Sequence, residues 1–244
     1  MRIDVWSDIA CPWCYVGKRR LESALGGFEH AEDVEVVWHS FELDPGAPDT
    51  PVETATAALA RKYGGGPEQI AAMQDRVSQI AEGEGLDYRL GETLHLNTRD
   101  AHRLVHLALE TGGPQLQGRL KEALLDAYFV QARDVSDADV LREVAAQVGL
   151  DADAVTRVLE GEEYDAAVTA DVEQARAYGA NGVPFFVVDG RYGISGAQPT
   201  EVFAGALRQA WSERTPVLQT IGSAQGAADD AAACGPDGCE LPGS

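Results

Sequence analysis

Two cysteines near the start of the chain, Cys11 and Cys14, are separated by Pro12 and Trp13. An apolar, strand-like segment leads into the first cysteine, and a helical pattern follows the second. The first turn of a helix has unpaired N–H groups and the positive end of the helix dipole, so a sulfur placed there ionises readily. Proline suits the first helical position. The four residues therefore predict a redox site, with Cys11 as nucleophile and Cys14 as resolving thiol.

A second pair of cysteines, Cys234 and Cys239, lies near the end of the chain and flanks the sequence Gly-Pro-Asp-Gly. Proline and glycine at these positions are typical of a tight turn. Such a turn brings the flanking cysteines close enough for a disulfide. Three roles remain open for this pair: a redox relay that exchanges with the first pair, a static terminal disulfide or disordered end, and a metal clip.

The Cys-x-x-Cys spacing of the first pair also occurs in half of a four-cysteine zinc site. Such a site would require both cysteine pairs to meet. The Pro12-Trp13 dipeptide at a helix start favours redox chemistry instead, and we predict no metal at Cys11 and Cys14. Asp8, three residues before the first cysteine, is either a proton acceptor or a polar end to the strand.

The elements around the first pair follow from the pattern of apolar residues. A strand containing Ile3 and Val5, a helix that extends to about Leu25, and a β-prone run from Val34 to Phe41 give the order βαβ. Such a connection implies a parallel pair of strands.

From about residue 50 to residue 160 the pattern is helical. A capping box, Thr50-Pro51-Val52-Glu53, opens a helix that ends at the glycines 64–66. Further helices are predicted from Pro67 to about 83, from Asn97 or Thr98 to 112, from Pro114 to about 132, from a Ser136 cap to Gly149, and over 151–159.

The last part of the chain begins with a helix over about 164–178, followed by the sequence Gly-Val-Pro at 182–184. Strands at 185–188 and 191–195 flank Asp189-Gly190, a dipeptide typical of hairpin turns. An amphipathic helix then extends from Pro199 to about 211. The complete order is β-α-β, a helical block, and α-β-β-α.

Composition restricts the partners and the location. The 244 residues include 40 Asp and Glu against 19 Lys and Arg, for a formal net charge of −21. This charge argues against binding to nucleic acid or an anionic membrane. The sequence has no run of about 20 apolar residues and no leader before the first strand, so we expect a cytoplasmic protein.

Four separated runs of sequence resemble the FrnE-like branch of the DsbA-type thioredoxin superfamily: CPWCYVGKRRL, FELDP, NTRDAHRLVHLA and GVPFFVVDGRYGISGAQP. This branch is related to 2-hydroxychromene-2-carboxylate isomerases and kappa-class glutathione transferases. The resemblance covers about residues 1 to 215 and implies an α/β, thioredoxin-like fold. A thioredoxin-like domain would comprise 1–48 and 162–215, an all-helical insertion 49–161, and a flexible C-terminal tail 216–244.

The resemblance also implies a role for Val183 and Pro184. In thioredoxin-like folds the matching proline is cis and faces the dithiol. The backbone of Val183 would then lie beside Cys11, where an extended substrate can add as a strand. Val183 and Pro184 therefore join Pro12 and Trp13 as expected docking residues.

The function we expect is a thiol–disulfide oxidoreductase of the protein disulfide reductase or isomerase type. Its substrates would be protein or small-molecule thiols and disulfides, with no metal or organic cofactor, and glutathione can serve as co-substrate. One alternative is a glutathione-dependent isomerase or transferase of the kappa or chromene type, acting on an aromatic substrate. Those isomerases typically carry serine where Cys11 stands. Another alternative is a metal-binding or interaction protein that uses all four cysteines.

Overall fold

A computed structural model describes residues 1–64, 66–214, 234–235 and 238–239. Within the part before residue 215, strands pair into one mixed sheet in the order β2-β1-β3-β4. The strands are β1 (Arg2–Ser7), β2 (Glu35–Ser40), β3 (Phe185–Val188) and β4 (Tyr192–Ser195). Strand β1 is parallel to β2 and antiparallel to β3, and β3 and β4 form a hairpin. The predicted thioredoxin-like α/β fold is confirmed.

The hairpin between β3 and β4 turns at the predicted dipeptide. Asp189 has φ 53° and Gly190 has φ 66°. Positive φ at both central residues is the geometry that matches the twist of the flanking strands, and it explains the Asp-Gly sequence.

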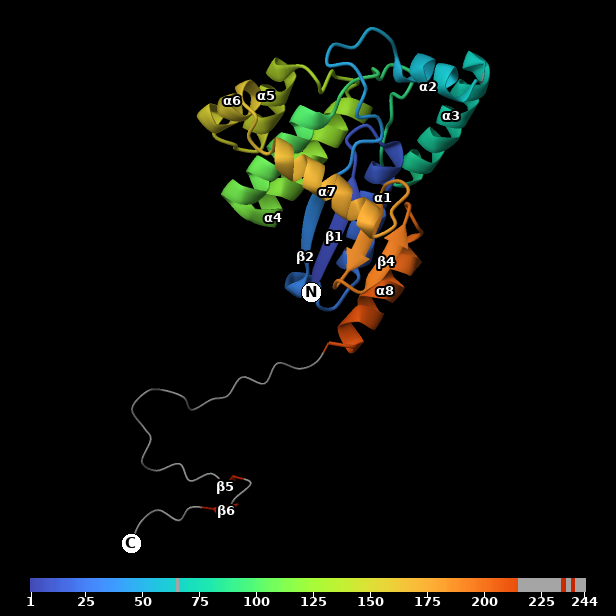
Figure 1. Cartoon of the computed structure of the whole chain (residues 1–244). Helices are drawn as coiled ribbons and strands as arrows, with labels where there is room; N and C mark the ends of the chain where they lie inside the picture. Colours follow the sequence, from blue (N-terminus) through green and yellow to red (C-terminus); the bar gives the residue numbers. More distant parts are fainter. Residues whose placement is uncertain (65, 215–233, 236–237, 240–244) are drawn as a thin grey trace. The chain divides into compact units, whose positions relative to one another are not determined.

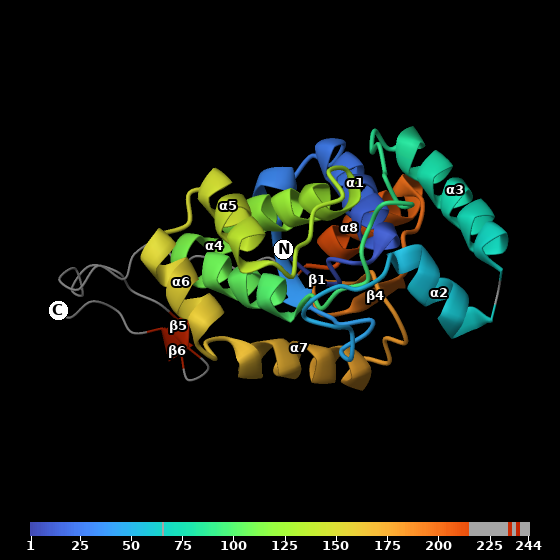
Figure 2. The same ribbon diagram turned by 90° about the horizontal axis from the view of Figure 1, so that it is seen from above.

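The alternation of side chains along β1 divides the core between the two faces of the sheet. Ile3 and Val5 are fully buried, and pair with Val188 and Phe186 on the face covered by α1 (Pro12–Gly26) and α8 (Thr200–Ser212). Trp6 packs on the opposite face, against α7 (Asp165–Ala177). Figures 1 and 2 show α7 on one side of the strands and α1 with α8 on the other.

The segment between β2 and α7 is helical, as predicted. Its elements are α2 (Ala55–Tyr63), α3 (Pro67–Gly83), α4 (Arg99–Phe129), α5 (Ala138–Gln147) and α6 (Ala152–Glu160); a short 3₁₀ turn, Ala31–Asp33, precedes β2. Helix α4 leaves helical geometry at Gly113, where φ is 68° and ψ is −172°. The predicted pair of helices is therefore one element with a break at the predicted place. The proposed limits of the insertion, 49–161, stay a prediction.

The start of α2 differs from the prediction. Residues 50–53 do not form a capping box, and the helix begins at Ala55, after the cap Thr54, whose side chain accepts a hydrogen bond from the N–H of Ala57. The physical reason is long-range pairing. The carbonyl of Glu53 accepts from the N–H of His95, so the backbone here is committed to a neighbouring segment and cannot be helical.

The cap of α5 is also one residue later than predicted. Asp137, and not Ser136, accepts hydrogen bonds from the N–H groups of Asp139 and Val140. The hydroxyl of Ser136 instead donates to Asp134. Because both the N–H and the hydroxyl of Ser136 bond to Asp134, the next residue, Asp137, is the one that caps the helix.

Near the C-terminus, β5 (Cys234–Gly235) and β6 (Gly238–Cys239) form an antiparallel pair in which Cys234 is opposite Cys239. This register agrees with the turn predicted between the two cysteines. The predictions for 216–233, 236–237 and 240–244 lie outside the described residues. None of the helices in the described part of the chain has the length and apolar character needed to cross a membrane.

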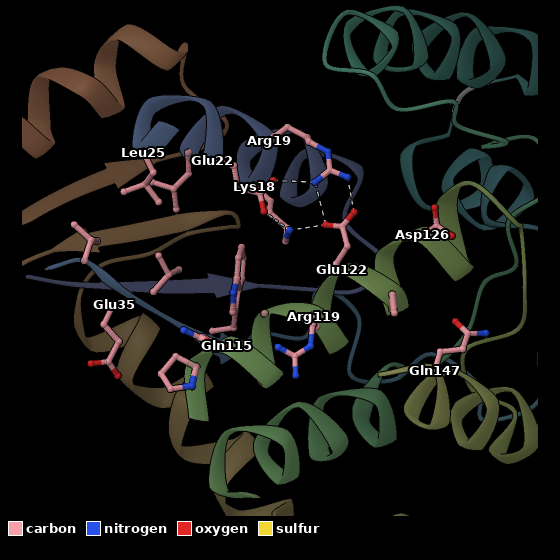
Figure 3. Close-up of a pocket in the computed structure, with 17 residues that line it drawn as sticks. Lys18, Arg19, Glu22, Leu25, Glu35, Gln115, Arg119, Glu122, Asp126 and Gln147 are labelled. Carbon is pink, nitrogen blue, oxygen red and sulfur yellow. Dashed lines mark hydrogen bonds and ion pairs between the residues drawn. The ribbon is translucent and has the colours of Figure 1, made fainter. Parts of the chain in front are cut away.

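Helices α1 and α4 are joined by a cluster of charged residues around Glu122. This carboxylate accepts hydrogen bonds from Lys18 and Arg19, which Glu22 also contacts (Figure 3). It also accepts a hydrogen bond from the hydroxyl of Tyr15. The cluster lies along a groove of about 1210 Å³ between α1, β2 and α4, which neither Cys11 nor Cys14 lines. The ion pairs therefore fix the position of α1 against the helical segment.

On the other face of the sheet, His39 links β1, β2 and α7. Its Nε2 lies 2.7 Å from Asp4 and its Nδ1 lies 2.9 Å from Asp171, while its ring stacks on Trp6 at 4.5 Å. Burial lowers the pKa of His39, but the two carboxylates outweigh this effect and hold the pKa above its ordinary value. The protonated imidazole is thus part of the fold.

The sign of this pKa shift predicts how stability depends on pH. Because the pKa is higher in the folded state, the contribution of His39 is complete below its unfolded pKa of about 6.5 and is lost as pH rises through the folded pKa. The difference in free energy of unfolding between the wild type and His39→Gln should therefore be greatest below about pH 6.5, until acid titrates Asp4 and Asp171, and shrink as pH rises through the folded pKa. Urea unfolding at several pH values measures it. A difference that is constant with pH would contradict this assignment.

Candidate active site

The strand–helix junction places Cys11 at the cap of α1. Cys11 has extended backbone geometry (φ −101°, ψ 110°), Pro12 is the first helical residue, and the N–H of Cys14 donates to the Cys11 carbonyl at 3.0 Å. The side chain of Cys11 makes no capping bond to the helix backbone. Cys11 is thus the N-cap residue of α1, and its sulfur is not used to cap the helix.

The two sulfurs differ in environment although both are reduced and buried. Burial raises the pKa of the Cys14 thiol well above its ordinary value, and the hydrogen bond to Cys11 raises it further. Trp13, between them, is 36% exposed. The site thus combines a thiol at a helix end, a protonated partner behind it, and an exposed aromatic ring.

A loop from far along the chain completes the site. The Val183–Pro184 peptide bond is cis, and the Sγ of Cys11 donates to the Val183 carbonyl at 3.5 Å. Gly17 of α1 makes this approach possible, because a Cβ there would lie 3.0 Å from the ring of Pro184 and 3.2 Å from Phe186. The structure therefore brings the Cys11–Cys14 pair together with Val183-Pro184, which lies 169 or more residues further along the chain.

Asp8, in the segment between β1 and α1, is held by several hydrogen bonds. The carboxylate accepts hydrogen bonds from Leu43 N–H at 2.8 Å and the Thr98 hydroxyl at 2.9 Å, with the Nε2 of His102 at 3.3 Å. Burial alone would raise the pKa of Asp8, but these donors hold it below its usual range. A carboxylate with a lowered pKa is a weak base, so Asp8 is a poor proton acceptor near neutral pH. Its contacts therefore favour the structural interpretation, a polar end to the strand.

Lys121 is a site residue that the sequence interpretation missed. It is fully buried on α4, and its Nζ donates to the carbonyl of Ser7 at 3.2 Å. Burial lowers the pKa of Lys121 to about 8. Helical spacing offered a signal, since Lys121 falls on the stripe formed by Gln117, Leu124 and Tyr128, all of which are buried.

A cavity of about 450 Å³ lies beside the junction. Asp8 and Ala10, the residue that precedes Cys11, form part of its wall, and Leu96 and Tyr128 contribute apolar surface. Its outer part includes Arg61, Lys62 and His95. The cavity has the size and the mixed lining of a small-molecule site.

The second cysteine pair belongs to the C-terminal unit, Glu213–Ser244, which is described separately from Met1–Ser212. The backbones of Cys234 and Cys239 are opposite each other in β5 and β6. Their roles as relay, disulfide or metal clip stay predictions.

Comparison with known proteins identifies relatives over most of the chain. A family model described as a DSBA-like thioredoxin domain matches residues 2–208. A solved structure described as a probable DsbA oxidoreductase from Streptomyces coelicolor is 48% identical, with 100% of each chain covered and a TM-score of 0.83. The uncharacterised protein YwbO of Bacillus subtilis is 29% identical over 85% of this chain and 96% of its own length.

A more distant structure, the cytosolic disulfide reductase DsbM from Pseudomonas aeruginosa with GSH, has a TM-score of 0.60. It is 20% identical, and the match covers 87% of this chain and 100% of that one. At this level of identity the likeness concerns the fold.

The environment of Asp8 yields a prediction. Asp8→Asn keeps the shape but removes the charge that its hydrogen-bond donors share, the N–H of Ala10 among them, so the free energy of unfolding should fall by about 1–3 kcal/mol. Disulfide turnover per folded molecule should stay close to that of the wild type. Urea unfolding and a turnover assay measure the two effects, and Asp44→Asn, at a half-exposed carboxylate, is the control. Unchanged stability with a large loss of turnover would instead support the proton-acceptor role.

Proposed function

Because the chain belongs to the DsbA-like thioredoxin domain family, we propose that it is a thiol–disulfide oxidoreductase that acts through the Cys11–Cys14 dithiol. The observation that carries this proposal is the contact between Cys11 and the carbonyl of Val183. It joins the sulfur at the N-terminus of α1 to a backbone segment beside the cis proline Pro184.

The proposed reaction has two exchange steps. The Cys11 thiolate attacks one sulfur of a substrate disulfide and releases the other as a thiolate, which takes up a proton. Cys14 then loses its proton and attacks Cys11, so that a Cys11–Cys14 disulfide forms and the reduced substrate leaves. Two electrons pass from the dithiol to the substrate, and the reverse sequence oxidises a substrate dithiol.

Substrate docking would use the surfaces on either side of Cys11. An extended segment can add beside Val183, where main-chain hydrogen bonds hold it without regard to its sequence. The exposed ring of Trp13 offers apolar contact on the other side. This arrangement suits protein or peptide thiols and disulfides of varied sequence.

The proposal extends to the location of the protein and the direction of electron flow. We propose a cytoplasmic protein, where the thiol pool keeps dithiols of ordinary potential reduced, so that it acts as a reductase or isomerase. No metal or organic cofactor is required, since the electrons reside on the two sulfurs. Glutathione is the co-substrate we propose for returning the disulfide to the dithiol.

A second candidate is a glutathione-dependent isomerase or transferase that uses the cavity of about 450 Å³ beside Ala10. The apolar wall of this cavity suits an aromatic substrate. The presence of both Cys11 and Cys14 favours the redox function. Glutathione binding and turnover of an aromatic substrate by Cys11→Ser would favour the second candidate.

Trapping tests the redox function directly. Cys14→Ser removes the resolving thiol, so a mixed disulfide on Cys11 should accumulate when the reduced protein meets glutathione disulfide or an oxidised protein. Non-reducing gels and intact mass spectrometry detect the adduct. Cys11→Ser is the control and should form no adduct at Cys14, because that thiol is buried and its pKa is raised. Absence of any adduct on Cys14→Ser would refute the proposal.

A further inference from the structure

Lys121 is buried without a carboxylate partner. Its Nζ donates to the Ser7 carbonyl at 3.2 Å and lies 6.0 Å from the ring of Trp38, and it forms no ion pair with a carboxylate in the described part of the chain. Lys18, which is also buried, differs because it pairs with Glu22 and Glu122. A buried ammonium loses its hydration and needs compensation by negative charge or dipoles. The compensation for Lys121 must come from elsewhere.

The titratable groups around Lys121 indicate which of them compensate its charge. The titratable groups that interact with its charge are Cys11, Cys14, Asp8, Lys18 and His102. Asp8 is already satisfied by its own donors, while His102 is kept neutral because burial lowers its pKa. Lys18 repels the ammonium. The remaining groups are the two sulfurs, which carry negative charge when they act as thiolates in the exchange steps.

A peptide group connects the lysine to the inner sulfur. The carbonyl of Ser7, which accepts the Lys121 hydrogen bond, belongs to the same peptide unit as the N–H of Asp8. That N–H lies against the sulfur of Cys14 and favours its thiolate. An ammonium on the carbonyl side polarises the peptide and strengthens the N–H as a donor, because hydrogen bonds in a chain reinforce one another.

We propose that Lys121 is a positioning residue that stabilises the Cys14 thiolate while this thiolate resolves the mixed disulfide on Cys11. The proposal rests on the redox function proposed above. In the resolving step the Cys14 thiolate attacks the sulfur of Cys11, the Cys11–substrate bond breaks, and the substrate leaves as a thiolate. The proton that Cys14 released is regained by the departing substrate sulfur, so atoms and charge balance and Lys121 stays protonated throughout.

This role explains how the buried thiol can ionise, and it implies a coupling between the lysine and the dithiol. Burial makes the inner thiol hard to ionise, and a fixed positive charge opposes that effect without exposing the sulfur to solvent. By linkage, the thiolates also stabilise the ammonium, so loss of the thiols on oxidation should weaken proton binding by Lys121. The lysine and the dithiol are thus coupled in both directions.

Stopped-flow reaction with 5,5′-dithiobis(2-nitrobenzoate) separates the two steps. Attack by Cys11 releases a first nitrothiobenzoate, and resolution by Cys14 releases a second. In Lys121→Met we expect the second phase to slow about tenfold at pH 7, with its pH midpoint raised by about one unit, since below the midpoint the rate follows the thiolate fraction. The first phase should change less.

Two variants serve as controls. Lys121→Arg keeps the charge and should retain most of the second-phase rate. Lys18→Met removes a lysine of similar burial that pairs with carboxylates, and its second phase should match the wild type. Methionine in place of a buried charge is compatible with folding, which circular dichroism verifies. A second phase with unchanged rate and pH midpoint in Lys121→Met would overturn the proposal.

NMR of the wild-type chain with ¹³C-labelled lysine gives a test that does not depend on the folding of a variant. The Lys121 resonance, assigned with Lys121→Arg, should titrate at lower pH in the oxidised protein than in the reduced protein. Identical titration in both states would overturn the role of Lys121 alone. Absence of any second phase in the wild type would instead refute the redox function.

Discussion

The contact between the sulfur of Cys11 and the carbonyl of Val183 is the constraint on which the site depends. It exists because β1 and β3 pair antiparallel, with Trp6 opposite Phe185, so that the end of one strand lies beside the start of the other. The absence of a side chain at Gly17 then lets α1 approach the cis-proline loop. Sheet register, helix position and a single glycine together decide where the sulfur meets a substrate.

A polar layer beneath the dithiol is the second feature of the molecule. Asp8 and Lys121 are buried groups of opposite charge that interact with each other, and His102, whose Nε2 lies 3.3 Å from Asp8, stays neutral because burial lowers its pKa. The Nδ1 of His102 is buried without a hydrogen-bond partner among the described residues. Burying such groups opposes folding unless hydrogen bonds and opposite charges compensate for the lost hydration.

Some predictions succeeded because their signals are local. The tight turn between β3 and β4 requires positive φ, and Asp189 and Gly190 adopt it. Pro12 is the first residue of α1, where the N–H that proline lacks would have had no partner within the helix. The start of α2 failed as a prediction because the carbonyl of Glu53 bonds to His95, more than forty residues away. A capping box visible in the sequence cannot compete with backbone pairing that only the tertiary fold creates.

The sequence by itself determined the order of strands and helices and the dithiol at a strand–helix junction, because the spacing of Cys11 and Cys14 and the apolar periods are local properties. Tertiary structure alone decided the charge states around them. The ionised state of Asp8 depends on donors from two distant segments, and Lys121 reaches the junction from a helix more than 100 residues further along the chain. Burial and hydrogen bonding set a pKa, and both are sums over neighbours that only folding brings together.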